Sequence, residues 1–362
     1  VQPPIRDFYL TAKRTVPYGL ASIAASCIAE GFSVEILDAL ASSRQRDIEW
    51  PEEMAYLKAY YGRPDATPFA LFHRYRHYGY SFEHLGKMAR QSGAFLVGIS
   101  SLFTPYSGEA LETAAWIKGA HPTCQIVMGG HHPTEMPQHA MQCPSVDFVI
   151  RGDGEKAMPL LATALQMGCS LDDIPGIVYR DEKGEMIAAR PHRINDPEDF
   201  LLPATHLINH RYYKRGTKGS TVIVASRGCP GRCSYCCMRQ SHERHFIQRP
   251  VESVLEEIDR AVKRDDSRFI DFEDENLSLN RRWFMALLHE IIIRFNGANL
   301  ELRCMNGLFP PTLDTEVINA MAKAGFKALN LSLGSSSPCL LYTSDAADEH
   351  RDVVVWGVGG GG

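Results

Sequence analysis

The sequence lacks any apolar run that approaches the length of a membrane span, and its N-terminus lacks the pattern of a signal peptide. It also lacks a strong surplus of charge of one sign, because 38 Lys and Arg stand against 43 Asp and Glu. These absences predict neither a membrane nor a nucleic acid as a partner, and we expect a cytoplasmic protein. Its 362 residues exceed the usual size of one domain, so two domains are predicted.

The cysteines do not have the spacing of a secreted disulfide framework. Three of them, Cys229, Cys233 and Cys236, crowd into eight residues. Others are scattered and are expected to be small core residues: Cys27, Cys124, Cys143, Cys169 and Cys304. The triplet is therefore the main candidate for chemistry.

The sequences at both ends of the chain are unlike those of a typical natural protein. The chain opens with Val1 and Gln2 before Pro3 and Pro4, without a starting methionine, which indicates the last step of a strand whose first residues are missing. Residues 339–362 resemble the translation of a sequencing-library adaptor followed by read-through, and we expect the protein's own sequence to end near Pro338. A natural glycine-rich tail is the alternative, but flexible linkers lack an apolar stretch such as residues 353–356.

The first part of the chain alternates between helix and strand patterns. Helices are predicted over 18–29 and 108–118, and strands over 32–38, 95–99, 125–128 and 147–150. Residues 48–92 are rich in aromatics without clean periodicity and are interpreted as a helical insertion. The alternation predicts a doubly wound, Rossmann-like α/β domain over residues 1–168, with ligands bound beyond the carboxyl ends of its strands.

Small residues follow the predicted strands of this domain. Ser100, Ser101 and Leu102 follow one strand, and Gly129 and Gly130 follow the next. A Gly-Gly pair after a strand is by itself an ordinary turn. As an ordered set, however, Ser100, Leu102, Gly129 and Gly130 resemble the motifs of cobalamin-binding domains.

A third strand end extends this resemblance. The run from Arg151 to Glu155 is similar to the strand end of cobalamin-binding radical S-adenosylmethionine (SAM) proteins, which implies cobalamin contacts at Gly152 and Glu155. The Asp-x-His-x-x-Gly loop that supplies a lower cobalt ligand in many cobalamin proteins is missing. We therefore expect cobalt without a protein histidine below it, and interpret His131 and His132 as contacts to solvent or a ligand tail.

Residues 169–219 are interpreted as a linker with a small hairpin near 174–184. A β-branched strand over 220–225 then leads directly into the cysteine triplet, with the spacing Cys-x-x-x-Cys-x-x-Cys. Three thiolates on a four-iron cluster leave one iron open to a ligand. Cys237 is interpreted as a packing residue, because adjacent cysteines have trouble serving one cluster.

The triplet resembles the motif of the radical SAM family, in which the open iron binds SAM. Tyr235 matches the aromatic residue that usually precedes the last cysteine. The alternative is a structural zinc site completed by His242 or His245, although such sites usually pair their cysteines in separate knuckles. Fold, cofactor and role all follow from this resemblance rather than from the spacing alone.

The rest of the sequence predicts a partial (βα) barrel over 220–338. Helices are expected over 251–264, 281–295 and 315–323, and strands over 269–272, 300–304 and 328–333, which gives about four of the six strands of a radical SAM barrel. By position at strand ends, the resemblance implies SAM contacts at Glu273, Asp274, Arg303 and Ser335. Acidic residues there can instead favour a helix N-terminus, and family members often have Glu where Ser335 stands.

Together these features predict an enzyme that uses a 4Fe-4S cluster to cleave SAM, with cobalamin as methyl carrier for methylation of an unactivated carbon or phosphorus centre. The resemblance implies a small-molecule or natural-product substrate and an external electron donor of the flavodoxin or ferredoxin type. A cobalamin-dependent radical cyclase or rearranging enzyme is the alternative, and a non-catalytic cobalamin- or zinc-binding module is the alternative from another class. With strands missing, we expect this polypeptide itself to be poorly active.

Overall fold

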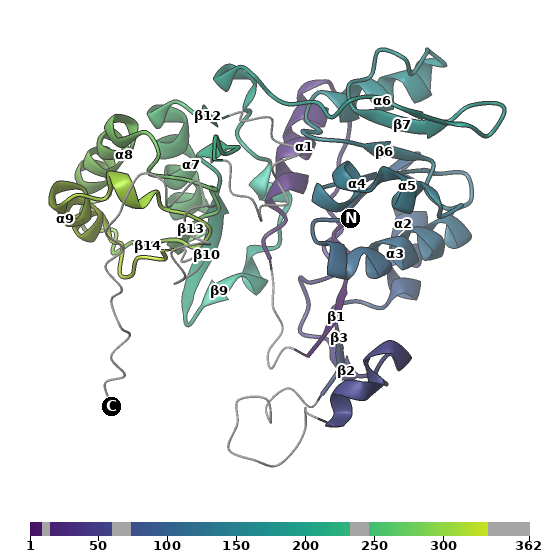
Figure 1. Ribbon diagram of the computed structural model, residues 1–362, viewed down its shortest axis with the longest axis horizontal. Coiled ribbons are helices and arrows are strands. Elements are labelled where there is room, and N and C mark those ends of the chain that lie inside the picture. Colours follow the sequence, from purple (N-terminus) through teal and green to yellow (C-terminus); the bar gives the residue numbers. More distant parts are fainter. Residues whose placement is uncertain (9–14, 60–73, 232–245, 332–362) are drawn as a thin grey trace, which may run out of the picture. The chain divides into compact units, whose positions relative to one another are not determined.

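The computed structural model describes residues 1–8, 15–59, 74–231 and 246–331. The chain divides into two compact units (Figure 1). The first comprises Val1–Asn195 and Asp199–Lys214, and the second comprises Asp196–Glu198 and Arg215–Gly362. No helix in the described ranges has the length and apolar character needed to cross a membrane.

The first unit is built on a five-stranded sheet in the order β4-β5-β6-β7-β8. Its strands are β4 (Leu96–Ser100), β5 (Gln125–Gly129), β6 (Phe148–Ile150), β7 (Ile177–Arg180) and β8 (Met186–Ala188). The first three are parallel and the last two are antiparallel. The carboxyl ends of β4, β5 and β6 therefore lie at one edge.

The chain start extends this sheet beside β4. Ser100 donates its backbone N–H to the carbonyl of Val1 (3.0 Å), and Gln2 forms a parallel bridge with Asp38. The strand predicted over 32–38 is reduced to this bridge, because only its last residues reach a partner.

Helices cover both faces of the sheet, as predicted. They are α1 (Tyr18–Ala29), α2 (Phe82–Ser92), α3 (Ser107–Ala120), α4 (His131–Glu135), α5 (Pro137–Met141) and α6 (Ala157–Met167). Ile126 and Met128 of β5 pack in one core with Ile117 of α3, whereas Val127 packs in another with Leu161 of α6. Successive residues of β5 thus enter opposite cores, which is the pattern of a strand buried on both faces.

The helical insertion predicted over 48–92 needs correction. The 3-10 helix η1 (Glu52–Ala59) and α2 (Phe82–Ser92) are helical as predicted, but residues 76–78 between them form a strand. Strand β3 (Arg76–Tyr78) lies between β1 (Ile5–Asp7) and β2 (Gln45–Asp47) in a small antiparallel sheet, and α2 packs on α3. The aromatic residue Tyr78 is fully buried by this pairing, so the irregular pattern reflected long-range packing.

The hairpin of the predicted linker also has a different place. Strand β7 pairs with β6, so the β7–β8 hairpin completes the sheet of the first unit. The rest of the segment is irregular, with 3-10 turns η4 (Pro197–Asp199), η5 (Thr205–Leu207) and η6 (His210–Tyr212). The hydroxyl of Tyr213 donates a hydrogen bond to the buried carboxylate of Asp38, which fastens the segment to the first unit.

The second unit contains a sheet in the order β14-β13-β10-β9. Its strands are β9 (Lys214–Arg215), β10 (Lys218–Ile223), β13 (Ser267–Phe272) and β14 (Glu301–Cys304). Strands β10, β13 and β14 are parallel, and the helices are α7 (Val251–Arg264), α8 (Arg281–Arg294) and α9 (Thr315–Ala324), with the 3-10 turn η8 (Pro310–Thr312) between β14 and α9. This is the predicted βα series.

The fourth strand predicted for the barrel is not formed over 328–331, and residues 332 and 333 lie outside the described part of the chain. Only Phe326 bridges to Leu302 of β14.

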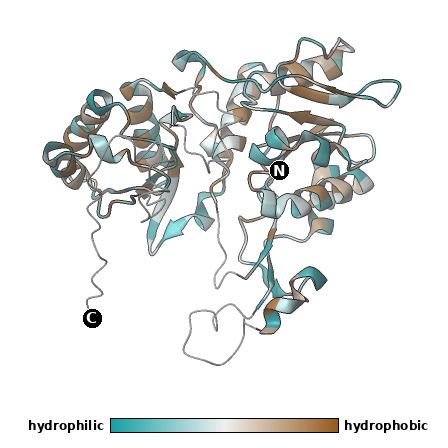
Figure 2. Cartoon of the chain, in the orientation of Figure 1, coloured by the Kyte–Doolittle hydropathy of each residue, from teal (hydrophilic) through white to brown (hydrophobic). Residues whose placement is uncertain are grey.

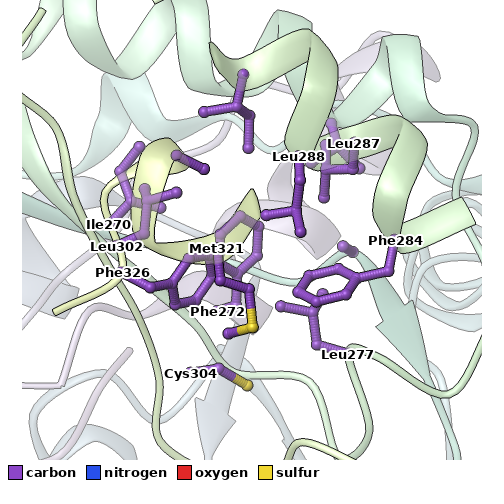
Figure 3. Close-up of a cluster of buried hydrophobic side chains, with 14 of the residues drawn as sticks. Ile270, Phe272, Leu277, Phe284, Leu287, Leu288, Leu302, Cys304, Met321 and Phe326 are labelled. Atoms are coloured by element: carbon purple, nitrogen blue, oxygen red, sulfur yellow. The ribbon is translucent and has the colours of Figure 1, made fainter. Parts of the chain in front are cut away.

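The core of the second unit lies between its sheet and its helices. Ile270, Phe272 and Leu302 contribute from the strands, and Phe284 and Met321 from the helices (Figure 3). Figure 2 shows brown and teal on the same helices, as expected when one face of each helix is buried. Because side chains alternate along a strand, Asp271 and Arg303 lie on the other face of the sheet.

Candidate cofactor sites

The strand ends of the first unit converge as the sequence predicts. Ser100 of β4 is paired with Gly129 of β5, and the backbone N–H of Ser101 donates to the carbonyl of Gly129 (2.8 Å). Gly130 has φ 115°, and a Cβ placed there would come within 2.5 Å of the Ser101 carbonyl oxygen. Glycine is therefore required at Gly130 for these two loops to touch.

A buried hydroxyl at this edge has no hydrogen-bond partner in the part of the chain that the structure describes. The Oγ of Ser101 is buried and forms no hydrogen bond within the described residues. Next to it in the chain, Leu102 and Phe103 are 39% and 51% exposed. An unpaired buried hydroxyl beside exposed apolar side chains fits a large ligand that has both polar and apolar parts.

The third strand end is arranged differently. Gly152 bridges to His192, and a Cβ on Gly152 would lie 2.0 Å from the carbonyl oxygen of His192. Glycine is therefore required at Gly152 for the chain to pack against His192, and the cobalamin contact at Gly152 stays a prediction. Glu155, half-buried just before α6, remains at the same edge.

The two histidines after Gly130 differ in their surroundings. His132 is buried, with Nδ1 3.2 Å from the Thr104 hydroxyl and Nε2 3.0 Å from Nδ1 of His139. Burial, aided by the neighbouring His139, lowers the pKa of His132. Both ring nitrogens are thus used within the protein. His131 begins α4 and is exposed.

In the second unit, the cysteine motif begins where strand β10 ends. Strand β11 (Ser226–Arg227) pairs with β12 (Ile247–Gln248) and brings the two ends of the intervening loop together. Cys229 is half-buried, and its Sγ accepts hydrogen bonds from the backbone N–H of Gly231 (3.4 Å) and the side-chain amide of Asn276 (2.9 Å). Donors of this kind stabilise a thiolate, the form of cysteine that binds metal clusters.

Several predicted residues lie outside the described part of the chain: Cys233, Tyr235, Cys236, Cys237, His242, His245 and Ser335. Among the scattered cysteines, Cys27, Cys124 and Cys304 are buried as expected, whereas Cys143 is half-buried and Cys169 is exposed.

Asp274 is placed inside the protein rather than at its surface. Its carboxylate is fully buried and accepts hydrogen bonds from the backbone N–H of Ala225 (3.1 Å) and the hydroxyl of Ser226 (2.5 Å). Burial raises the pKa of Asp274 to about 7 against these hydrogen bonds. The direct SAM contact predicted for Asp274 does not fit, because its oxygens already fasten the strand that leads to Cys229.

The other predicted polar residues remain accessible. The carboxylate of Glu273 accepts a hydrogen bond from the Asn306 amide (2.5 Å), which joins the loops after β13 and β14. Arg303 forms an ion pair with Asp271 on the face of the sheet opposite the core and keeps a third of its side chain exposed. Glu273 and Arg303 therefore place opposite charges at neighbouring strand ends.

Sequence reasoning missed Asn276, Ser226 and Ser101 as site residues. Asn276 lay within the acidic run after β13, but nothing in the sequence indicated that its amide reaches Cys229, 47 residues earlier. Ser101 lay between two predicted contacts, and only the structure shows that its hydroxyl is buried without a partner.

Two family matches cover these sites. Residues 72–162 match the B12 binding domain, and residues 223–343 match the radical SAM superfamily. The first range contains the strand ends at Ser100 and Gly129, and the second contains the cysteine triplet.

The chain is also similar in sequence to curated proteins. The chain is 27% identical over 263 residues to an uncharacterized methyltransferase of Pyrococcus horikoshii, covering 72% of this chain and 56% of that protein. It is 28% identical over 253 residues to the anaerobic magnesium-protoporphyrin IX monomethyl ester cyclase of Rubrivivax gelatinosus, covering 68% and 44%. The chain thus spans about half the length of these relatives.

A solved structure shares the fold. The radical S-adenosylmethionine methyltransferase TsrM from Kitasatospora setae, with cobalamin and a [4Fe-4S] cluster bound, superposes with a TM-score of 0.65 at 21% identity, over 92% of this chain and 59% of that one. The two family matches thus identify a B12 binding domain followed by a domain of the radical SAM superfamily in this chain.

Proposed function

We propose that this protein is a cobalamin-dependent radical SAM enzyme that methylates an unactivated carbon or phosphorus centre of a small molecule. The observation that carries the proposal is the setting of Cys229, in the loop that follows the first parallel barrel strand, with N–H donors from Gly231 and Asn276 on its Sγ. Cys229, Cys233 and Cys236 would hold a 4Fe-4S cluster, which would supply the electron for cleavage of SAM, and bound cobalamin would supply the methyl group.

Residues of the second unit have distinct roles in this proposal. Glu273 accepts a hydrogen bond from the SAM ammonium, since its carboxylate is half-buried at a strand end. Arg303 faces the carboxylate of SAM, with Asp271 holding its guanidinium in place. Tyr235 and Ser335 complete the SAM site, whereas Asp274 positions the strand end before Cys229.

The first unit would hold cobalamin at the edge formed by Ser100, Leu102, Gly129 and Gly130, with Glu155 beside it. The unpaired hydroxyl of Ser101 supports this placement, because a ligand would give it a partner. His132 has both ring nitrogens in use, which supports cobalt bound without this histidine below it.

The reductive cleavage of SAM needs one electron from outside, and we propose a donor of the flavodoxin or ferredoxin type in the cytoplasm. Cyclisation or rearrangement is the second candidate, favoured by the similarity to the cyclase of Rubrivivax gelatinosus. Both reactions use the same two cofactors, so cofactor content alone does not separate them.

Anaerobic reconstitution tests the proposal. We expect a brown protein with about four irons per chain, cobalamin bound, and SAM cleaved to 5′-deoxyadenosine or demethylated. Replacement of Cys229, Cys233 and Cys236 by alanine should abolish the iron and the SAM turnover while cobalamin stays bound. Stoichiometric zinc without iron would contradict the enzyme, and transfer of label from methyl-labelled SAM to a product separates methylation from cyclisation.

A further inference from the structure

The side-chain amide of Asn276 stands apart from the residues that the sequence assigned to any site. It follows strand β13 and donates to Sγ of Cys229 at 2.9 Å, a short contact for a hydrogen bond to sulfur. The backbone N–H of Gly231 donates to the same sulfur at 3.4 Å. Cys229 thus receives one donor from its own loop and one from the neighbouring strand end.

The position of Asn276 is fixed by contacts on both sides of its loop. Asp274 is held by Ala225 and Ser226, at the end of the strand that carries Cys229. On the other side, Leu277 donates its backbone N–H to the carbonyl of Gly307 (3.2 Å). A Cβ on Gly307 would lie 1.9 Å from the carbonyl oxygen of Glu275, so the loops pack with no room for a side chain.

We propose that Asn276 is a positioning residue that hydrogen-bonds the Cys229 ligand of the cluster and raises the reduction potential of that cluster. This inference rests on the proposed function, because it requires a 4Fe-4S cluster on Cys229. An N–H donor to a thiolate ligand stabilises the more negative, reduced state, and the hydrogen bonds to sulfur are among the groups that set cluster potentials.

Reduction of the cluster is a transfer of one electron. One electron passes from the external donor of the flavodoxin or ferredoxin type to the oxidised cluster, the donor is oxidised by one electron, and no bond is formed or broken. Losing one hydrogen bond to a charged acceptor corresponds to about a tenfold change in an equilibrium constant. The ratio of reduced to oxidised cluster at a fixed electrode potential should change by about this factor.

The test uses Asn276→Leu, which removes the amide at similar volume, and Asn276→Ser, which keeps a shorter donor. Asn280→Ser is the matched control: it removes an amide four residues further along, and a serine oxygen can still accept the Trp283 N–H that Asn280 caps in α8. Iron content, the electron paramagnetic resonance signal and the redox titration of the reconstituted protein are measured for each.

At a fixed electrode potential we expect the ratio of reduced to oxidised cluster to fall about tenfold in Asn276→Leu, less in Asn276→Ser, and not in Asn280→Ser. An Asn276→Leu variant with a full complement of iron and an unchanged titration would overturn the inference and leave the proposed function standing. Iron lost from Asn276→Leu but kept in Asn276→Ser supports the need for a donor, whereas equal loss from both overturns it. A wild-type protein without any cluster defeats the inference and the proposed function together.

Discussion

At the scale of single residues, the hydroxyl of Ser101 links stability to binding. Removing a buried hydroxyl that has no partner relieves a desolvation cost, so Ser101→Ala should leave the cobalamin-free protein equally stable or more stable by about 1 kcal/mol. If cobalamin provides the missing partner, the same change should weaken cobalamin binding by about tenfold. Thermal unfolding and cobalamin titration measure the two effects.

Ser22→Ala serves as the matched control for this change. Ser22 is also buried in the first unit, but its hydroxyl donates to the carbonyl of Tyr18. Its loss should lower stability slightly and leave cobalamin affinity unchanged. A Ser101→Ala protein that binds cobalamin as tightly as the wild type contradicts the assignment of Ser101.

A second prediction at this scale concerns the effect of substituting Gly130 on stability. Alanine there needs an unfavourable φ of 115° and places a Cβ 2.5 Å from the carbonyl oxygen of Ser101. We expect Gly130→Ala to lower the free energy of unfolding by roughly 2–4 kcal/mol. Gly168→Ala has a φ of 67° but meets nothing within 4 Å, so it should cost only about 1 kcal/mol. Equal losses in urea unfolding would show that the close approach of the loops is unimportant.

At the scale of elements, the clearest link is the one that Asp274 makes between β13 and the end of β10. Burial raises its pKa from 3.8 to about 7, so the folded protein keeps a proton that the unfolded chain releases. Asp274 therefore stabilises the folded state fully below about pH 4, and this stabilisation is lost as pH rises through about 7. The cluster-free protein should therefore lose stability on the order of a few kcal/mol across this window.

Asp274→Asn tests this link. The asparagine oxygen can accept the Ala225 N–H while its amide donates to Ser226, so it imitates the neutral carboxyl group at every pH. We expect the slope of unfolding free energy against pH, between pH 4 and 7, to be flatter in the variant than in the wild type. Identical slopes would show that Asp274 ionises normally in the folded protein.

Elements with local signals were predictable from the sequence. Helix α1 has the predicted bounds, and α9 begins at the cap Asp314 and ends at Gly325 in a left-handed conformation. Strands β1, β2 and β3 were missed as paired elements, because three-residue strands are defined by partners distant in sequence. Cys229 belongs to a local motif, so its place after a strand was predictable. The burial of Asp274 depends on Ala225 and Ser226, which are distant in sequence, and was therefore not predicted.

At the scale of the whole molecule, two regions of alternating helix and strand predicted two folded units. The division falls within residues 195–215, near the end of the segment interpreted as a linker. The sequence did not indicate that the linker hairpin belongs to the sheet of the first unit. Strand β7 has an ordinary strand pattern, and helix α6 separates it in sequence from its partner β6. Each unit has a buried core of its own.

Separate cores predict separate unfolding. In the cofactor-free protein we expect two thermal transitions, and cobalamin should raise only the one that belongs to the first unit. Cobalamin at 100 times its Kd contributes about 2.7 kcal/mol, which corresponds to a shift of about 5–10 °C for a unit of this size. Hydrogen exchange assigns the transitions, since peptides from β4 and β5 report on the first unit and peptides from β13 and β14 on the second.

The variant Gly130→Ala should remove the shift that cobalamin causes in the first transition, because the loop at residue 130 no longer fits against Ser101. A single transition that cobalamin moves as a whole would mean that the two units unfold together, and that the cobalamin edge and the cysteine loop are coupled in stability.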